Sequence, residues 1–186
     1  MRCGAADAVR GSAAPLDELR YILVDSTAVG LVVESAALLE KLALDGEQRG
    51  RLRFVVVLEG APSVGWDPNL ACLGWQELLE RGAGQVVPWP EGGPGRLATL
   101  LYTSGTTGQP KGVPLTHANL LHQLCQLGVA VAPQVGDRAL SILPIWHAYE
   151  RSAEYFLLAC GCRQTYTTLK HSVSYTHLRA HETDSY

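Results

Sequence analysis

Residues 100–119, LLYTSGTTGQPKGVPLTHAN, join an apolar segment to a loop of glycines and hydroxylated residues that closes on a lysine. The apolar residues 100–102 predict the end of a buried strand, and the turn-forming residues after them predict that the strand stops there. Gly105 and Gly108 allow positive φ, so successive backbone N–H groups can turn toward an anion. Lys111 adds a compact cation. Hydroxyl groups that can donate to phosphate oxygens come from Thr103, Ser104, Thr106 and Thr107. The stretch therefore predicts a phosphate-binding loop.

The spacing of this loop is not that of a Walker A motif, because Gly105 leads to Pro110-Lys111-Gly112 and not to Gly-Lys-Ser/Thr. Residues 102–113, YTSGTTGQPKGV, closely resemble the phosphate-binding signature of the adenylate-forming enzymes. That family includes acyl-CoA synthetases, luciferases and peptide-synthetase adenylation domains. A surface turn without a ligand is the alternative, and the length of the match disfavours it.

The composition is that of a globular protein, with 186 residues, 47% hydrophobic residues, 18% charged residues and a net charge of −3. This length fits one domain, and the charge gives no reason to expect a nucleic acid as partner. Charged residues interrupt every long apolar run, so we expect no transmembrane segment, and the first residues lack the pattern of a signal peptide. Peripheral contact with a membrane stays open.

The five cysteines are irregularly spaced, which is typical of reduced thiols in a cytoplasmic protein rather than of a disulfide framework. Cys160-Gly-Cys162 could suggest a metal or redox site. No second pair of ligands with suitable spacing accompanies it, so we interpret both residues as buried thiols.

Apolar periodicity and turn residues predict an alternation of helices and strands. Helices are expected from Pro15 until Asp25 and Ser26 break the helix, after Ser35 as N-cap, over 75–81, after Thr116 as N-cap and over 149–159. Strands are expected over 30–33, 54–58, 139–143 and 163–168, whereas 59–95 is otherwise expected to be irregular. The helix after Thr116 should carry an apolar stripe formed by Leu120, Leu121, Leu124, Leu127 and Val131.

Such an alternation predicts an α/β fold, with a layered, largely parallel sheet flanked by helices. Ligands of such sheets bind at the carboxyl ends of strands, where the loop after Tyr102 lies. The resemblance implies that the chain is a partial N-terminal domain of an adenylate-forming enzyme.

A second match covers Ser141–Cys162, SILPIWHAYERSAEYFLLACGC. It is most similar to long-chain fatty acyl-CoA and acyl-ACP synthetases of cyanobacteria and plant plastids. In that family an aromatic or histidine position after Leu-Pro borders the carboxylate substrate, which implies this role for Trp146 and His147. Arg151 and Glu154 are interpreted as an i, i+3 pair at the surface.

The resemblance implies that a fatty acid attacks ATP to give an acyl-adenylate, and that coenzyme A or acyl carrier protein then takes the acyl group. The loop residues 103–108 and Lys111 would hold the ATP phosphates with Mg²⁺, and no catalytic residue is assigned. Two alternatives stay open: an adenylating enzyme for short-chain acids or amino acids, and a nucleotide-binding module without catalysis.

Residues 1–172 are interpreted as a fragment of the AMP-binding domain. Residues 173–186 resemble the translation of a transposon-type sequencing adapter, so we expect them not to be native. The adenine-site, ribose-site and C-terminal motifs of the family are missing. We therefore expect no ATP–pyrophosphate exchange by the 186-residue chain alone.

Overall fold

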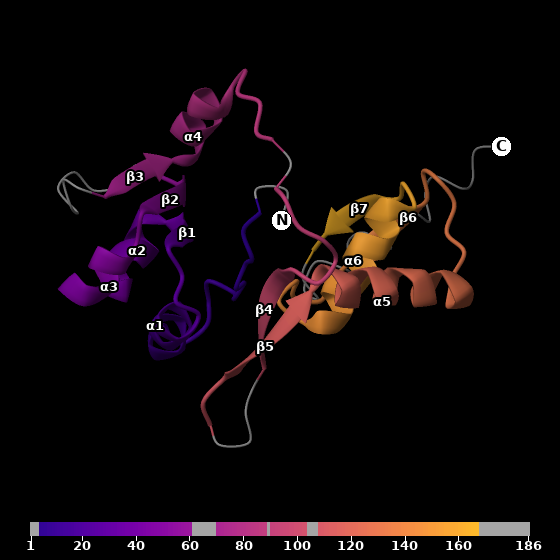
Figure 1. The fold of residues 1–186 in the computed structure, drawn as a ribbon, viewed down its shortest axis with the longest axis horizontal. Helices are drawn as coiled ribbons and strands as arrows, with labels where there is room; N and C mark the ends of the chain where they lie inside the picture. Colours follow the sequence, from indigo (N-terminus) through magenta and orange to yellow (C-terminus); the bar gives the residue numbers. More distant parts are fainter. Residues whose placement is uncertain (1–3, 61–69, 89, 104–107, 168–186) are drawn as a thin grey trace, which may run out of the picture. The chain divides into compact units, whose positions relative to one another are not determined.

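The computed structural model describes residues 4–60, 70–88, 90–103 and 108–167 (Figure 1). The chain forms two compact units, Met1–Leu115 and Thr116–Tyr186, and each is described by itself. Parallel strands alternate with helices in both units. The expected α/β class with parallel sheet and flanking helices is therefore confirmed.

A parallel sheet in the first unit has the strand order β1-β2-β3. It consists of β1 (Gly30–Ser35), β2 (Phe54–Glu59) and β3 (Ala71–Gly74). Val56 of β2 pairs with Val32 on one side and with Leu73 on the other. Val55, Val56 and Val57 are all buried, as expected for a central strand covered on both faces. The strands predicted at 30–33 and 54–58 are confirmed, each running slightly further.

Four helices accompany this sheet in the described part of the first unit: α1 (Leu16–Asp25), α2 (Ala36–Leu42), α3 (Gly46–Arg51) and α4 (Trp75–Gly82). The Ser35 hydroxyl accepts from the Leu38 N–H, so the predicted N-cap of α2 is confirmed. The predictions of α1 and α4 are also confirmed. Two elements were missed: α3, and strand β3, which lies where only irregular chain and a short helix were expected.

The core of the first unit lies where the helices meet the sheet. Leu39 and Leu44 are each 1% exposed and pack in one cluster with Val55 and Val57. Burying an aliphatic side chain of this size contributes about 1.5–3 kcal/mol. Contacts of this cluster therefore hold α2 against β2.

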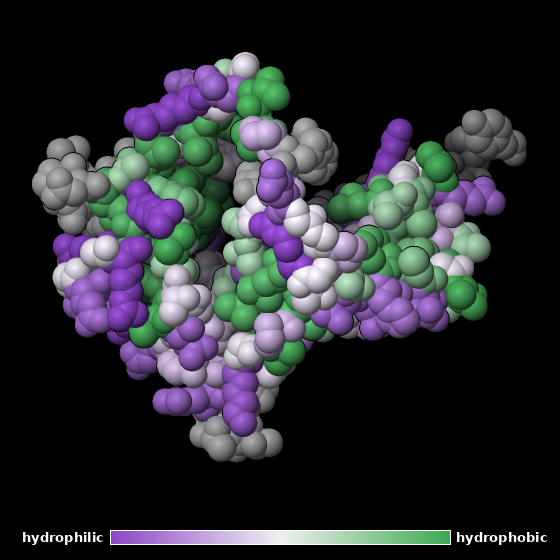
Figure 2. All heavy atoms as spheres, in the orientation of Figure 1, coloured by the Kyte–Doolittle hydropathy of each residue, from purple (hydrophilic) through white to green (hydrophobic). Residues whose placement is uncertain are grey.

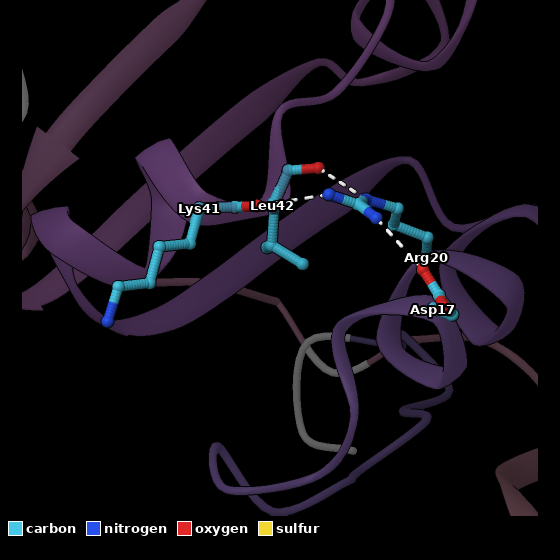
Figure 3. A network of polar contacts seen from close by, with 4 residues as sticks. All are labelled: Asp17, Arg20, Lys41 and Leu42. Carbon is cyan, nitrogen blue, oxygen red and sulfur yellow. Dashed lines mark hydrogen bonds and ion pairs between the residues drawn. The ribbon is translucent and has the colours of Figure 1, made fainter.

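Arg20 of α1 joins two helices through polar contacts (Figure 3). Its Nε donates to the Leu42 carbonyl at 2.7 Å and one terminal nitrogen donates to the Lys41 carbonyl at 3.1 Å. The other terminal nitrogen pairs with Asp17 at 3.0 Å. The last carbonyls of a helix lack intrahelical partners, so Arg20 caps the C-terminus of α2.

Strands β4 (Leu97–Thr103) and β5 (Lys111–Thr116) are hydrogen-bonded neighbours. The N-terminal segment pairs beside β4, where Asp7 forms a parallel bridge with Thr99. The predicted strand end at residues 100–102 is confirmed. The sequence analysis predicts a helix after the loop and no strand between them, so β5 was missed.

The second unit contains α5 (His117–Ala130), β6 (Arg138–Ser141), α6 (Ala148–Ala159) and β7 (Arg163–Tyr166). β6 and β7 pair in parallel, with Leu140 opposite Thr165, and α5 packs against α6. The expected cap of α5 is present, because Thr116 and Asn119 form a reciprocal capping box. The strand predicted over 139–143 ends at Ser141, so the prediction is wrong for residues 142 and 143.

Apolar side chains reach the surface in both units. Figure 2 shows hydrophobic residues among hydrophilic ones on the face in view. On α5, Leu120 is buried, but Leu121 is 52% exposed and Val131, just after the helix, is also 52% exposed. The predicted stripe is therefore only partly covered. Among the described helices, none is long and apolar enough to cross a bilayer.

Candidate functional site

The first candidate site is the connection between β4 and β5. Thr103 is the last residue of β4 and Lys111 is the first residue of β5, and both side chains are exposed. A parallel pair needs a crossover of a dozen or more residues, so this shorter connection makes an antiparallel hairpin. The predicted residues Ser104, Gly105, Thr106 and Thr107 lie outside the described part of the structure.

Gly108 lies at the exit of this connection, where it has a φ of +86°. Residues with a side chain rarely adopt this conformation, so the position favours glycine. A Cβ atom built there would meet no atom within 4 Å, so the space beside the backbone is open. The glycine therefore allows a left-handed backbone conformation at the exit of the connection.

The chemistry of this segment suits an anion. Residues 100–119 contain no Asp or Glu, whereas Thr103 and Lys111 present a hydroxyl group and an ammonium group at the two strand ends. Among the described residues, no ion pair engages Lys111. An exposed cation beside hydroxyl donors, without a competing carboxylate in the same segment, can bind phosphate.

A buried tyrosine precedes the loop. Tyr102 is 4% exposed, and its hydroxyl donates to Oδ2 of Asp25, the last residue of α1, at 2.6 Å. Burial raises the pKa of the Tyr102 phenol, and the hydrogen bond to the Asp25 carboxylate raises it further. The sequence analysis predicts only that Asp25 lies at the end of a helix. No local pattern could have linked two residues that lie 77 positions apart.

The second candidate site is the turn before α6, in the other unit. His147 is the N-cap residue of α6, with an exposed side chain, and Trp146 beside it is half-buried. The His147 N–H donates to the Pro144 carbonyl at 3.0 Å, and its own carbonyl accepts from the Arg151 N–H at 3.1 Å. These backbone bonds fix the turn and leave the imidazole at the surface.

Buried polar groups lie beneath this turn. Glu150 is 7% exposed and accepts a hydrogen bond from the Ser141 hydroxyl at the end of β6. Arg151 is 4% exposed, and its Nε donates to the Ile145 carbonyl at 3.3 Å. Arg151 was predicted to lie at the surface as a partner of Glu154. That placement of Arg151 is wrong, because its side chain is buried beside the turn. Glu154 accepts a hydrogen bond from the Tyr166 hydroxyl at 2.5 Å.

In the described part of the chain, the cysteines and potential metal ligands form no further site. Cys162 is buried, as predicted, and its thiol donates to the Gln134 carbonyl at 3.7 Å, whereas Cys160 is half-buried. Burial raises the pKa of the Cys162 thiol, and the nearby Asp137 carboxylate adds to the effect. Within the described ranges, no three His, Cys, Asp or Glu residues are grouped so that they could hold a metal ion.

Known proteins resemble this chain in sequence and in fold. The chain is 37% identical over 184 residues to the chloroplastic long-chain-fatty-acid–[acyl-carrier-protein] ligase AEE15 of Arabidopsis thaliana, covering 92% of this chain and 25% of the relative. It is 38% identical over 105 residues to the peroxisomal long chain acyl-CoA synthetase 7 of the same plant, covering 54% of this chain and 15% of the relative. The chain thus spans about a quarter or less of these relatives.

The fold is similar to that of the N-terminal domain of FACL13 from Mycobacterium tuberculosis. The TM-score is 0.66 at 20% identity, and the similarity covers 88% of this chain and 38% of that structure. Residues 1–181 match the family described as AMP-binding enzyme. The match includes both candidate sites. The chain therefore belongs to the AMP-binding enzyme family.

Proposed function

We propose that the protein to which this chain belongs activates long-chain fatty acids with ATP. The fatty carboxylate would attack the α-phosphorus of ATP to give an acyl-adenylate and pyrophosphate. The thiol of coenzyme A or of an acyl carrier protein would then take the acyl group and release AMP. Membership of the AMP-binding family supports the adenylation step. The names of the relatives, a ligase for long-chain fatty acids and a long chain acyl-CoA synthetase, support the substrate class.

The observation that carries the proposal is the hairpin between β4 and β5, which presents donors at both strand ends and lacks acidic side chains. Lys111 would offset the negative charge of the β- and γ-phosphates, and Thr103 would donate to a phosphate oxygen. The backbone around Gly108, together with Ser104, Gly105, Thr106 and Thr107, completes the proposed phosphate site. Positioning and charge neutralisation are what phosphoryl chemistry chiefly requires of a protein.

Mg²⁺ would accompany ATP. Residues 100–119 offer hydroxyl and carbonyl oxygens but no carboxylate, so the phosphate oxygens would be its main ligands. Trp146 and His147 would border the fatty carboxylate, because they occupy an ordered turn with the imidazole exposed. We also propose a cytoplasmic location, since Cys72, Cys125, Cys160 and Cys162 are free thiols.

The test is ATP–pyrophosphate exchange by the full-length protein with a panel of fatty acids. Lys111→Ala should lower exchange at least tenfold, on the order of the loss when one charge-assisted contact to the reacting group is removed. Lys41→Ala is the matched control, because Lys41 is an exposed lysine of α2, and it should leave exchange unchanged. Undiminished exchange by the Lys111→Ala variant would contradict the proposal.

A further inference from the structure

The phosphate loop is joined at its base to a distant helix. Tyr102 directly precedes Thr103, and its buried hydroxyl donates to Asp25 at 2.6 Å. Hydrogen bonds to an ionised acceptor are shorter and stronger than neutral ones, and 2.6 Å lies in their range. One side-chain contact therefore connects the end of β4 to the end of α1.

The position of Asp25 has no explanation within its own helix. Asp25 is the last residue of α1, and the last turn holds no basic residue. A carboxylate at a helix C-terminus faces the negative end of the helix dipole, which disfavours it. The Tyr21 hydroxyl reaches the other carboxylate oxygen only at 3.4 Å. The close partner that favours this placement is Tyr102.

The ring of Tyr102 also contacts the other end of the loop. A Cβ atom built on Gly112 would lie 3.0 Å from Cζ of Tyr102 and 3.2 Å from its hydroxyl oxygen. Glycine is therefore the residue that lets β5 approach the ring so closely. The ring belongs to the residue before Thr103 and lies against Gly112, the residue after Lys111. Tyr102 is therefore adjacent to both candidate phosphate ligands, through the chain on one side and through packing on the other.

We infer that Asp25 and Tyr102 are positioning residues for ATP, because their hydrogen bond fixes the ring that lies between the strand ends carrying Thr103 and Lys111. The inference rests on the phosphate site of the proposed function and adds two residues that need not touch the nucleotide. A ring released from Asp25 gains freedom, and ordering it again on binding lowers affinity. The effect should therefore fall on ATP and not on the fatty acid.

The experiment measures equilibrium binding of ATP to the full-length protein by calorimetry, together with the KM values for ATP and for the fatty acid. Tyr102→Phe keeps the ring and removes the hydroxyl, and Asp25→Ala removes the acceptor at an exposed position. Each should weaken ATP binding about tenfold, on the order of one hydrogen bond to a charged group. The KM for the fatty acid should not change.

Further variants separate positioning from general stability. Asp25→Asn retains a carbonyl oxygen that can accept from Tyr102, so it should restore part of the affinity. The double variant Tyr102→Phe/Asp25→Ala should bind no more weakly than either single variant, because both remove the same bond. Tyr166→Phe is the matched control for loss of a hydroxyl, because Tyr166 donates to Glu154 in the other unit, and it should bind ATP like the wild type.

Unchanged ATP affinity in Tyr102→Phe and Asp25→Ala, even with a lower melting temperature, would overturn the inference, as would fully additive losses or a wild-type protein that does not bind ATP. If the wild-type protein binds ATP but activates no fatty acid, the proposed function is contradicted. The binding measurements would then still decide this inference, because they need no fatty acid.

Discussion

The hydroxyl of Ser141, the last residue of β6, donates a hydrogen bond to the carboxylate of Glu150 in the first turn of α6. Both residues are at most 7% exposed. The bond spans the segment that carries Trp146 and His147, so it ties together the two elements that flank the second candidate site. A buried polar group without a partner is costly, which makes this pair testable.

Glu150→Ala should lower the free energy of unfolding by about 1–3 kcal/mol, the cost of leaving a buried hydroxyl unsatisfied. Glu150→Gln keeps an acceptor oxygen for Ser141 and should cost less. Urea unfolding of the full-length protein, followed by tryptophan fluorescence, measures both. Equal stability of the two variants would show that the hydrogen bond contributes nothing.

Gly112→Ala should weaken ATP binding by up to about tenfold, as loss of the Tyr102 hydroxyl does. The added methyl group would lie 3.0 Å from the ring and displace it from Asp25. Calorimetric titration with ATP checks the change. Gly82→Ala is the control, because Gly82 ends α4 and a Cβ atom there meets nothing within 4 Å. An equal loss of ATP affinity in this control would contradict a specific role for the contact between Gly112 and Tyr102.

Thr116→Ala should destabilise α5 by about 1 kcal/mol, the typical contribution of an N-cap side chain. The hydroxyl of Thr116 accepts from the Asn119 N–H at 3.2 Å, and the Asn119 side chain accepts from the Thr116 N–H at 2.9 Å. Thr116→Ser preserves the hydroxyl and should be close to the wild type in urea unfolding. Identical loss in the serine and alanine variants would exclude the capping interaction as the cause.

The Tyr166 phenol should lose its proton at a higher pH than an ordinary tyrosine does. Its hydrogen bond to Glu154 raises the pKa of the phenol from 10.0 to about 12, with burial and the carboxylate charge as smaller causes. The folded state favours the protonated phenol, so this stabilisation is complete below pH 10.0 and is lost as the pH rises through about 12. The phenolate absorbance that Tyr166→Phe removes should therefore have its midpoint near 12.

Glu154→Gln provides the matched variant for this titration, because it removes the charge and keeps the shape. Its Tyr166 midpoint should move back toward 10.0. Circular dichroism over the same pH range verifies that the protein stays folded. A wild-type midpoint that already lies at 10.0 would contradict the hydrogen bond.

Local patterns predicted the helices and central strands well. The apolar face of α1, the Ser35 and Thr116 caps and the β-branched run of β2 each depend on residues only a few positions apart. The predicted phosphate residues Thr103, Gly108 and Lys111 lie at one hairpin, where the first strand end was also expected. Trp146 and His147 lie together in one turn, in a separate unit.

Contacts beyond the local sequence pattern account for three of the errors: β3, β5 and the burial of Arg151. β3 has the sequence ACLG, without a β-branched residue, and it is a strand because it pairs with the edge of β2 opposite β1. β5 contains Gly112 and Pro114, which disfavour strands, and the hairpin with β4 overrides that preference. Arg151 was expected at the surface of a helix, but its side chain is buried and its Nε donates to the Ile145 carbonyl.

The sequence by itself determined the family signature, the helix caps and the donor-rich, acid-free character of residues 100–119, because each is written in neighbouring residues. Only the tertiary structure decided that Asp25 receives the Tyr102 hydroxyl and that Gly112 lies against the same ring. Those contacts join segments up to 77 positions apart. Their formation depends on how the helices and strands pack, which hydrophobic burial directs and which no short stretch of sequence specifies.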